Sequence, residues 1–255
     1  MNSQFIQSLI AGIFIGGLAG YLGSLMVAKK MALAGDALGH VALPGMGLAL
    51  LLGIDISIGA FLSLFVGVII VWLFGLRTPL PMETLVGIVF VASLAIGFLI
   101  IPQFELVEAL VGDISNVTPL MAVVSVFLSL VIFFILRKLY PGMILINISE
   151  DLAEVRGIKV KLYNLAYLLL ITVVVSLGVK ITGSLLVGSL LIIPAATSRN
   201  LSNNLRQYSL ISIFMGLSSC VVGAFLFQYF NVPAGPAIII VSTIFFLLSL
   251  LLKKK

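Results

Sequence analysis

Nine long apolar segments, separated by charged or Pro- and Gly-rich connections, limit what this chain can fold into. Of all residues, 62% are hydrophobic and 9% are charged, whereas about a quarter are charged in a typical soluble domain. A bilayer core about 30 Å thick takes about 20 apolar residues per helix, so 255 residues leave room for roughly eight to ten spans and no soluble domain. The sequence therefore predicts an all-α integral membrane protein, a polytopic bundle of about eight or nine transmembrane helices in one domain, residues 1–255.

The expected spans follow the apolar runs between charges and Pro or Gly clusters. They cover residues 5–28, 34–53, 56–76, 83–102, 118–137, 162–179, 182–198, 208–230 and 235–252. The first run lacks the positive start and the cleavage site of a secretory signal, so we expect it to remain as the first span. The count falls to eight if one short segment is re-entrant.

Two of these spans contain helix-breaking residues. The second is interrupted at Pro44 and Gly45, and the seventh meets Pro194. Non-helical backbone at membrane depth is tolerated only where protein or a water-filled cavity satisfies it. Pro44, Gly45 and Pro194 are therefore candidate breaks or gating positions on a transport pathway, and a proline kink used only for packing is the alternative.

The positions of the basic residues predict the orientation. If the N-terminus is outside, 13 of the 14 basic residues fall on the inner side and only Lys180 lies outside. The outer connections then hold Asp55 and the acidic stretch 102–116. We therefore expect an outer N-terminus and a cytoplasmic C-terminus, and we attribute the high pI to this asymmetry rather than to nucleic-acid binding.

Small residues are expected to pack helices closely. Gly12, Gly16 and Gly20 recur on one face of the first span, which is typical of close helix contact. Cys220, the single cysteine, has no partner for an intrachain disulfide and is expected to be a small packing residue.

Three ionisable side chains in or beside apolar spans need a partner or a function. Asp36 and His40, the single histidine, are spaced i, i+4 and share one helix face, and Glu83 opens the fourth span from the same side. Inserting such a group costs at least about 2.5–3.5 kcal/mol. Carboxylate and imidazole ligands suit Mn²⁺, Zn²⁺ or Fe²⁺ and offer no thiolate for Cu⁺. We therefore predict a divalent-metal path lined by these three residues.

Each of the three residues also has a structural interpretation. Asp36 fits a helix N-cap or an ion pair with Lys29 or Lys30, and His40 fits an interhelical hydrogen bond. Glu83 fits a favourable position at a helix start, where carboxylates interact with the helix dipole. These alternatives stay open at the level of sequence.

The chain contains none of the motifs expected of an enzyme. It has no G-x-x-x-x-G-K-[ST] sequence, so it does not bind ATP through a P-loop. It also has no H-E-x-x-H and no G-x-S-x-G motif. We therefore expect no catalytic residues and no permanently bound cofactor.

The longest charged stretch, "NISEDLAEVRGIKVKLYN", predicts a short exposed helix on the inner side. Ser149 is suited to cap it, Glu150 and Asp151 lie in its first turn, and Gly157 stops it. We call residues 147–162 the coupling segment and expect it to contact a partner protein, with a helix lying on lipid as the alternative. Its candidate contact residues are Asp151, Leu152, Glu154, Val155, Arg156 and Gly157.

Several stretches resemble the permease subunits of zinc and manganese ABC importers. They include "MALAGDALGHVALPGMGLALLLG", "METLVGIVFVASLAIGFLI", "EALVGDISNVT", "SLLIIPAATSRNL" and "FNVPAGPAIIIVSTIFFLLSLLL", in the family's order. The family's G-D-A-L-[SG]-H-[AV]-x-L-P-G pattern falls on the first of them. The resemblance covers most of the chain and rests on two specific blocks, this one and the block that ends in "PAATSR".

The resemblance implies a homodimer of permeases in a prokaryotic cell membrane. It further implies two copies of a cytoplasmic ATP-binding subunit and an extracytoplasmic metal-binding protein. By the same resemblance, Asp36 and His40 correspond to the translocation pair, Glu83 opens the following conserved span, and "DLAEVRGIKV" seats in a cleft of the ATPase. The transported ion is Mn²⁺ or Zn²⁺, with Mn²⁺ slightly favoured because one histidine per chain leaves mostly oxygen ligands.

Two other function classes are compatible with the residues. An ion-coupled secondary carrier would use Asp36 and Glu83 for protons, and a membrane scaffold or receptor would keep its ionisable residues for structure alone. ATP-dependent uptake that requires a separate ATPase distinguishes the importer from both.

Overall fold

The computed structural model describes residues 3–100, 118–182, 187–230 and 232–252, and the regular structure in those ranges is helical. The helices are α1 (Ser3–Ala28), α2 (Ala32–Val41), α3 (Leu43–Leu52), α4 (Ile56–Gly75), α5 (Met82–Ile100), α7 (Pro119–Ile148), α8 (Glu150–Val155), α9 (Val160–Thr182), α10 (Val187–Leu201), α11 (Leu205–Phe230) and α12 (Ala234–Leu251). The acidic stretch 102–116 lies outside the described residues. The predicted all-α membrane class is confirmed.

Eight helical stretches in the described ranges are long and apolar enough to cross a membrane, and α2 and α3 together form one of them, Ala32–Leu52. The segment predicted as the seventh span, 182–198, instead gives α10, which has 15 residues. At 1.5 Å per residue α10 is about 22 Å long, shorter than a bilayer core of about 30 Å. The described part of the chain thus gives the lower of the two expected counts.

Two prolines lie inside continuous helices, contrary to one predicted span end and one predicted break. The fifth span, expected to end at residue 137, continues as α7 past Pro141 to Ile148. Pro141 has no N–H to donate to the carbonyl of Arg137, and the helix continues there beside this exposed residue. The predicted break at Pro194 is also wrong, because α10 runs through this residue while packed against α1, α11 and α12.

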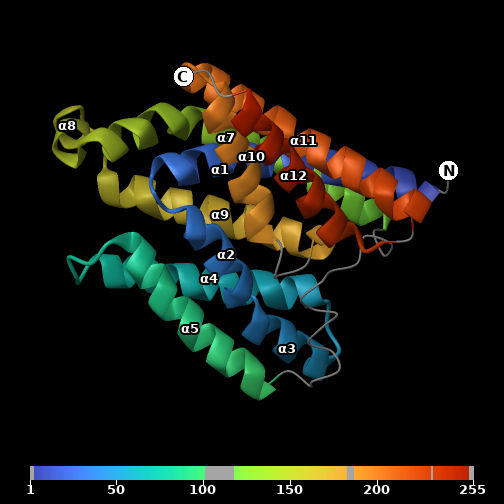
Figure 1. The fold of residues 1–255 in the computed structure, drawn as a ribbon. Coiled ribbons are helices and arrows are strands. Elements are labelled where there is room, and N and C mark those ends of the chain that lie inside the picture. Colours follow the sequence, from blue (N-terminus) through green and yellow to red (C-terminus); the bar gives the residue numbers. More distant parts are fainter. Residues whose placement is uncertain (1–2, 101–117, 183–186, 231, 253–255) are drawn as a thin grey trace.

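The helices form a larger and a smaller group (Figure 1). In the larger group α1 packs against α7, α9, α10 and α11, and α12 packs against α10 and α11. The smaller group consists of α3, α4 and α5. Between the groups, α2 contacts α10 on one side and α5 on the other, while α9 contacts α4. The helix with the predicted metal ligands therefore lies where the two groups meet.

Glycines on α1 allow α11 to approach closely, as the sequence predicted. A Cβ atom on Gly16 would lie 2.7 Å from the carbonyl oxygen of Gly216, and one on Gly20 would overlap the carbonyl of Ser212. Cys220 is buried on the same seam, against Gly16. Lipid tails are as apolar as the helix surfaces, so close van der Waals contact of this kind drives the association.

A second glycine contact joins α3 to α4. Gly45 and Gly59 face each other so closely that a Cβ on either would overlap the carbonyl oxygen of the other. Gly45 therefore allows α3 and α4 to pack closely, in addition to its position directly after Pro44.

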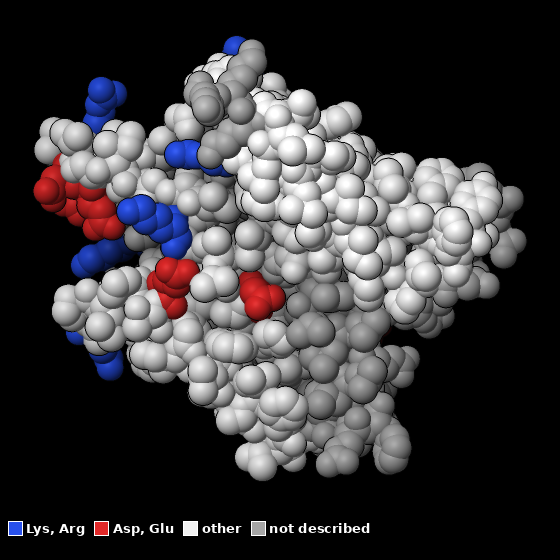
Figure 2. Space-filling model, in the orientation of Figure 1, with Lys and Arg blue, Asp and Glu red and all other residues white. Residues whose placement is uncertain are grey.

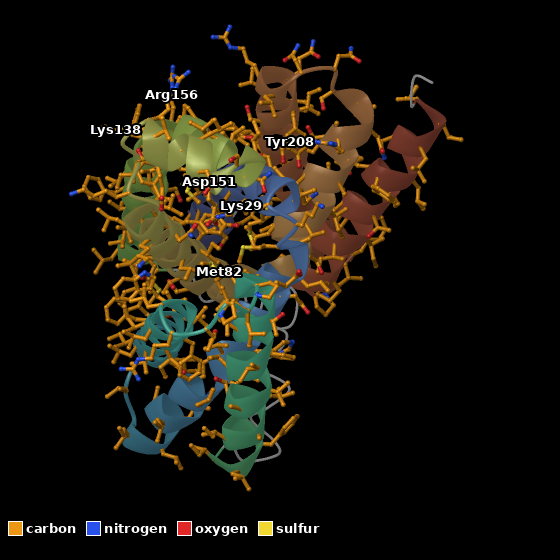
Figure 3. The ribbon with its side chains drawn as sticks, turned by 90° about the vertical axis from the view of Figure 1, so that its left-hand side faces the viewer. Lys29, Met82, Lys138, Asp151, Arg156 and Tyr208 are labelled. Atoms are coloured by element: carbon orange, nitrogen blue, oxygen red, sulfur yellow. The ribbon has the colours of Figure 1, made fainter. Side chains whose placement is uncertain are left out.

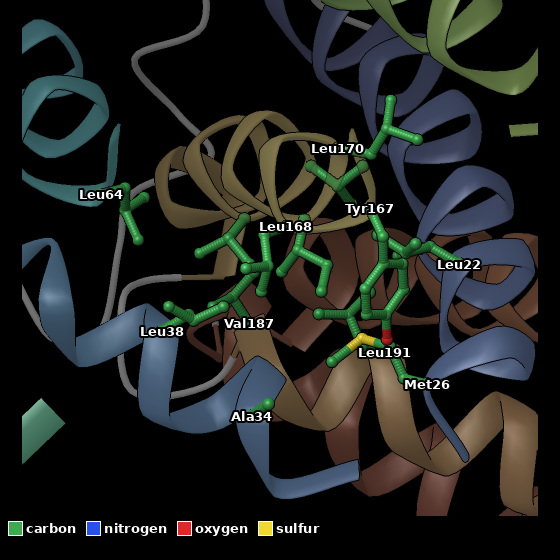
Figure 4. Close-up of a cluster of buried hydrophobic side chains, with 14 of the residues drawn as sticks. Leu22, Met26, Ala34, Leu38, Leu64, Tyr167, Leu168, Leu170, Val187 and Leu191 are labelled. Carbon is green, nitrogen blue, oxygen red and sulfur yellow. The ribbon is translucent and has the colours of Figure 1, made fainter. Parts of the chain in front are cut away.

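The buried core lies around α9, whose side chains meet those of α1, α2, α4 and α10 (Figure 4). Tyr167, Leu168 and Leu191 are fully buried there. This core joins both helix groups, so it fixes the position of α2 between them.

We predict that Gly59→Ala destabilises the fold, because its new Cβ meets the backbone of Gly45 rather than a side chain that can move. The expected loss is about 1–3 kcal/mol, the usual cost of overpacking. Thermal unfolding of the purified chain, followed by fluorescence of the single tryptophan, Trp72, measures it.

Gly87→Ala is the matched control, because a Cβ at Gly87 meets no atom within 4 Å. It should unfold at the parent temperature. Equal unfolding temperatures for the Gly59 and Gly87 variants would show that the contact between α3 and α4 is not tight.

Candidate functional site

Asp36 and His40 lie on consecutive turns of α2, with Asp36 half-buried and His40 buried. The residue that precedes α2 is Met31, which makes no side-chain capping bond. Asp36 lies a full turn inside the helix, so its interpretation as an N-cap is wrong. The helix therefore presents a carboxylate and an imidazole at the junction of the two helix groups.

His40 carries a buried nitrogen that nothing in the described structure satisfies. Its side chain is 9% exposed, and Nδ1 has no hydrogen-bond partner among the described residues. The ring centroid lies 5.4 Å from that of Phe90 on α5. A buried polar atom without a partner costs about 1–3 kcal/mol, and native structures seldom leave one without a reason. The predicted interhelical hydrogen bond is not made at this atom.

Glu83 lies in the first turn of α5, seven residues before Phe90 and thus on the same helix face. Leu43, at the start of α3, lies against Gly97 of α5, seven residues after Phe90. The segment formed by α2 and α3 therefore runs in the same direction as α5. Along the helix axes, Glu83 lies two turns, about 10 Å, before His40 and its neighbour Phe90. Asp36 lies one turn, about 6 Å, before His40. The three side chains follow one another along the junction of α2 and α5.

The predicted convergence of these side chains on one ion is not seen in the described residues. No group of three His, Cys, Asp or Glu side chains in those ranges is placed to hold a metal ion. Glu83 also occupies the helix-start position that its structural interpretation requires. A metal ion at Asp36 and His40 therefore needs further ligands from water or from another chain.

The predicted break at Pro44 is confirmed as an interruption between α2 and α3. Residue 42 separates the helices, and Pro44 lies at the start of α3, where its missing N–H costs no helical bond. The Oγ of Ser63 on α4 donates a hydrogen bond of 2.6 Å to the carbonyl of Val41. The end of α2 is thus held by a side chain from a neighbouring helix.

Gly188 on α10 is a site residue that sequence reasoning missed. A Cβ at this position would lie 2.6 Å from both the backbone nitrogen and the Cβ of Asp36. The backbone of α10 therefore lies in direct contact with Asp36. At position 188 the sequence shows only that the residue is glycine, and this does not indicate which helix packs against it.

A groove of about 670 Å³ runs along α3, α4 and α5. It is lined by apolar side chains with Ser63 and Ser93 and contains no charged residue. The groove therefore lacks the ligands of a metal path.

The coupling segment contains the predicted short helix, α8. The hydroxyl oxygen of Ser149 accepts a hydrogen bond of 3.3 Å from the backbone N–H of Leu152, and Gly157 has a positive φ of 78°. Leu152 is 54% exposed and Val155 87% exposed, and the other candidate contact residues of α8 are exposed as well. Charged side chains gather around α8 at one end of the molecule (Figure 2). This end offers an apolar and charged surface to a partner.

Comparisons with known proteins place the chain among metal-transport permeases. Residues 1–253 match the ABC 3 transport family. The manganese import system permease protein ScaB of Streptococcus gordonii is 32% identical over 99% of this chain and 92% of that protein. The high-affinity zinc uptake system membrane protein ZnuB of Buchnera aphidicola subsp. Baizongia pistaciae is 31% identical over 99% of both chains. A solved structure of PsaBC from Streptococcus pneumoniae in complex with Fab superposes with a TM-score of 0.84, at 28% identity, over 98% of this chain and 91% of that chain.

We predict that Gly188→Ala displaces α2 and lowers the stability of the fold by about 1–3 kcal/mol, because the added methyl group meets the backbone of Asp36. His40 is the single histidine, so its imidazole gives one set of NMR signals. These signals should shift in Gly188→Ala, and the unfolding temperature should fall.

The control is Gly17→Ala on α1, where a Cβ makes an ordinary contact of 3.5 Å with Ile213. It should leave the imidazole signals in place. Unshifted signals in Gly188→Ala would contradict the close contact between α10 and Asp36.

Proposed function

Because the chain belongs to the ABC 3 transport family, we propose that it is the permease subunit of an importer for a divalent transition-metal ion. The ion is Mn²⁺ or Zn²⁺, the metals named for its relatives ScaB and ZnuB, or the chemically similar Fe²⁺. The whole chain, residues 1–255, acts as one transmembrane permease domain. It has no ATP-binding motif of its own and takes its energy from a separate subunit.

The observation that carries this proposal is the unsatisfied Nδ1 of buried His40, one turn from Asp36. A lone pair there and a carboxylate on the same helix face supply two candidate metal ligands from one helix. Water, Glu83 or a second copy of the chain supplies the remaining ligands. A small ligand set binds weakly enough to release the ion, as a transport site must. Mostly oxygen ligands favour Mn²⁺ slightly over Zn²⁺.

The proposed assembly is a homodimer served by a cytoplasmic ATP-binding subunit and an extracytoplasmic metal-binding protein. The exposed face of α8 suits the first partner, and the acidic stretch 102–116, which the distribution of basic residues predicts on the outer side, suits the second. The distribution of basic residues favours an outer N-terminus and a cytoplasmic C-terminus in a prokaryotic cell membrane.

Alternating access accounts for transport in this assembly. ATP binding to the partner moves α8, which turns the two helix groups relative to each other around α2. The interruption between α2 and α3 lets the end of α2 change direction without unfolding a continuous helix. The metal site is thereby opened first to one side of the membrane and then to the other.

We predict that Asp36→Ala and His40→Ala reduce Mn²⁺ and Zn²⁺ uptake to background, because each removes one of the two ligands on α2. Uptake of either metal by cells that lack another importer, with equal expression confirmed, measures the effect. Glu83→Gln lowers uptake if this carboxylate contacts the ion and leaves it unchanged if it only stabilises the start of α5.

Asp55→Asn is the matched control, since Asp55 caps α4 by accepting a hydrogen bond of 2.8 Å from the backbone N–H of Ser57, and an amide oxygen can accept it too. This variant should transport at the parent rate. Parent uptake in both α2 variants would overturn the site assignment, and uptake by the purified chain alone under an ion gradient would favour a secondary carrier.

We predict that Val155→Asp prevents the ATP-binding subunit from co-purifying with the permease, because it places a charge in the exposed apolar contact of α8. Val232→Asp, another exposed valine but in the connection between α11 and α12 and outside the predicted spans, serves to show that an added charge alone does not release the partner. Retention of the ATP-binding subunit by Val155→Asp would place its docking surface elsewhere.

A further inference from the structure

The turn between α1 and α2 is tied to both sides of α8. We call residues 28–31, from the last residue of α1 to the residue before α2, the elbow. The elbow leads directly into α2, so Asp36 lies five residues after the end of the elbow. Any displacement of the elbow is a displacement of the start of the helix that carries Asp36 and His40.

The elbow has a defined geometry. The backbone N–H of Met31 donates 2.9 Å to the carbonyl of Met26, and that of Lys30 donates 3.2 Å to the carbonyl of Val27. These two bonds form a Schellman motif, which requires a left-handed residue at its centre. Here that residue is Lys30, with φ of 58°, where glycine is usual. The turn is therefore held in one conformation by hydrogen bonds.

Two asparagines that flank α8 bind this turn. Asn147, at the end of α7, donates from Nδ2 to the carbonyl of Ala28 over 2.6 Å. Asn164, in the second turn of α9, accepts at Oδ1 a hydrogen bond of 2.9 Å from the Nζ of Lys29. The two bonds join the elbow to the helix before α8 and to the helix after it.

The Lys29 side chain is half-buried on the α8 side of the elbow. It lies 4.9 Å from the centroid of the fully buried Tyr167 ring, one turn beyond Asn164 on α9. Burial lowers the pKa of Lys29 from 10.5 to about 8, and the nearby Glu150 of α8 opposes this change. Figure 3 shows Lys29 between Asp151 of α8 and Met82 at the start of α5. A half-buried cation that donates to Asn164 and lies against the Tyr167 ring has little freedom to move independently of α9.

We propose that Lys29, Asn147 and Asn164 are positioning residues that transmit the movement of α8 to the metal-binding helix α2. When the partner subunit moves α8, the ends of α7 and α9 move with it and carry the elbow through these two hydrogen bonds. The start of α2 then shifts, and with it Asp36 relative to Gly188 of α10. This inference rests on the proposed function and names the path between its energy source and its site.

The test uses the permease, its ATP-binding subunit and its metal-binding protein, purified and reconstituted together in liposomes, with radioactive Mn²⁺ or Zn²⁺ as the probe. The variants Lys29→Met and Asn164→Leu should still form the complex and hydrolyse ATP, while the metal transported per ATP falls at least tenfold. The double variant should transport no less than either single variant, because both remove the same bond.

Matched substitutions separate coupling from structure. Asn164→Asp keeps an acceptor for Lys29 and should stay within twofold of the parent ratio. Lys138→Met removes an exposed lysine of α7 near the same end of the molecule and should also match the parent. Asn147→Ala, which removes only the bond to Ala28, should lower the ratio without leaving Lys29 unpaired.

The inference is wrong if Lys29→Met, Asn164→Leu and Asn147→Ala all keep the parent ratio. It is equally wrong if transport and ATP hydrolysis fall in proportion, because that outcome marks a purely structural role. A parent complex that hydrolyses ATP without transporting Mn²⁺ or Zn²⁺ would instead overturn the proposed function and this inference with it.

Discussion

Close backbone contact at glycines holds this bundle together, and the rest of the structure depends on it. In a membrane there is no hydrophobic gain from bringing two apolar helices together, so association relies on van der Waals contact and on a few hydrogen bonds. Gly16 and Gly20 serve α1 against α11, and Gly45 and Gly59 serve α3 against α4. Gly188 repeats this arrangement at Asp36, where the close contact lies against a candidate metal ligand.

The candidate site follows from how α2 is held between the two helix groups. Its ionisable residues do not complete a metal site in the described residues, and His40 is left with a buried unsatisfied nitrogen. An incomplete site at a junction between groups suits transport better than storage, because the missing ligands can change as the groups move. The interruption before α3 and the hydrogen-bonded turn before α2 allow this short helix to move as a unit.

Sequence periodicity predicted most of the helices but not their ends at prolines. Lack of charge over about 20 residues is a strong indication of a span, and each predicted span corresponds to helix in the described residues. The fifth span was expected to end at residue 137 and the seventh to break at Pro194, yet α7 continues through Pro141 and α10 through Pro194. Whether a helix survives a proline depends on what satisfies the freed carbonyl, which local sequence does not contain.

By itself, the sequence determined the membrane class, the pair Asp36 and His40 on one helix face, and the capped helix α8, because each depends on residues within a few turns of one another. The tertiary structure alone decided that Phe90 faces His40 and that Gly188 backs Asp36. It also brought Lys29 to Asn164, 135 residues away, and Asn147 to Ala28, 119 residues away. Such pairs arise from the packing of whole helices, which no spacing along the chain encodes.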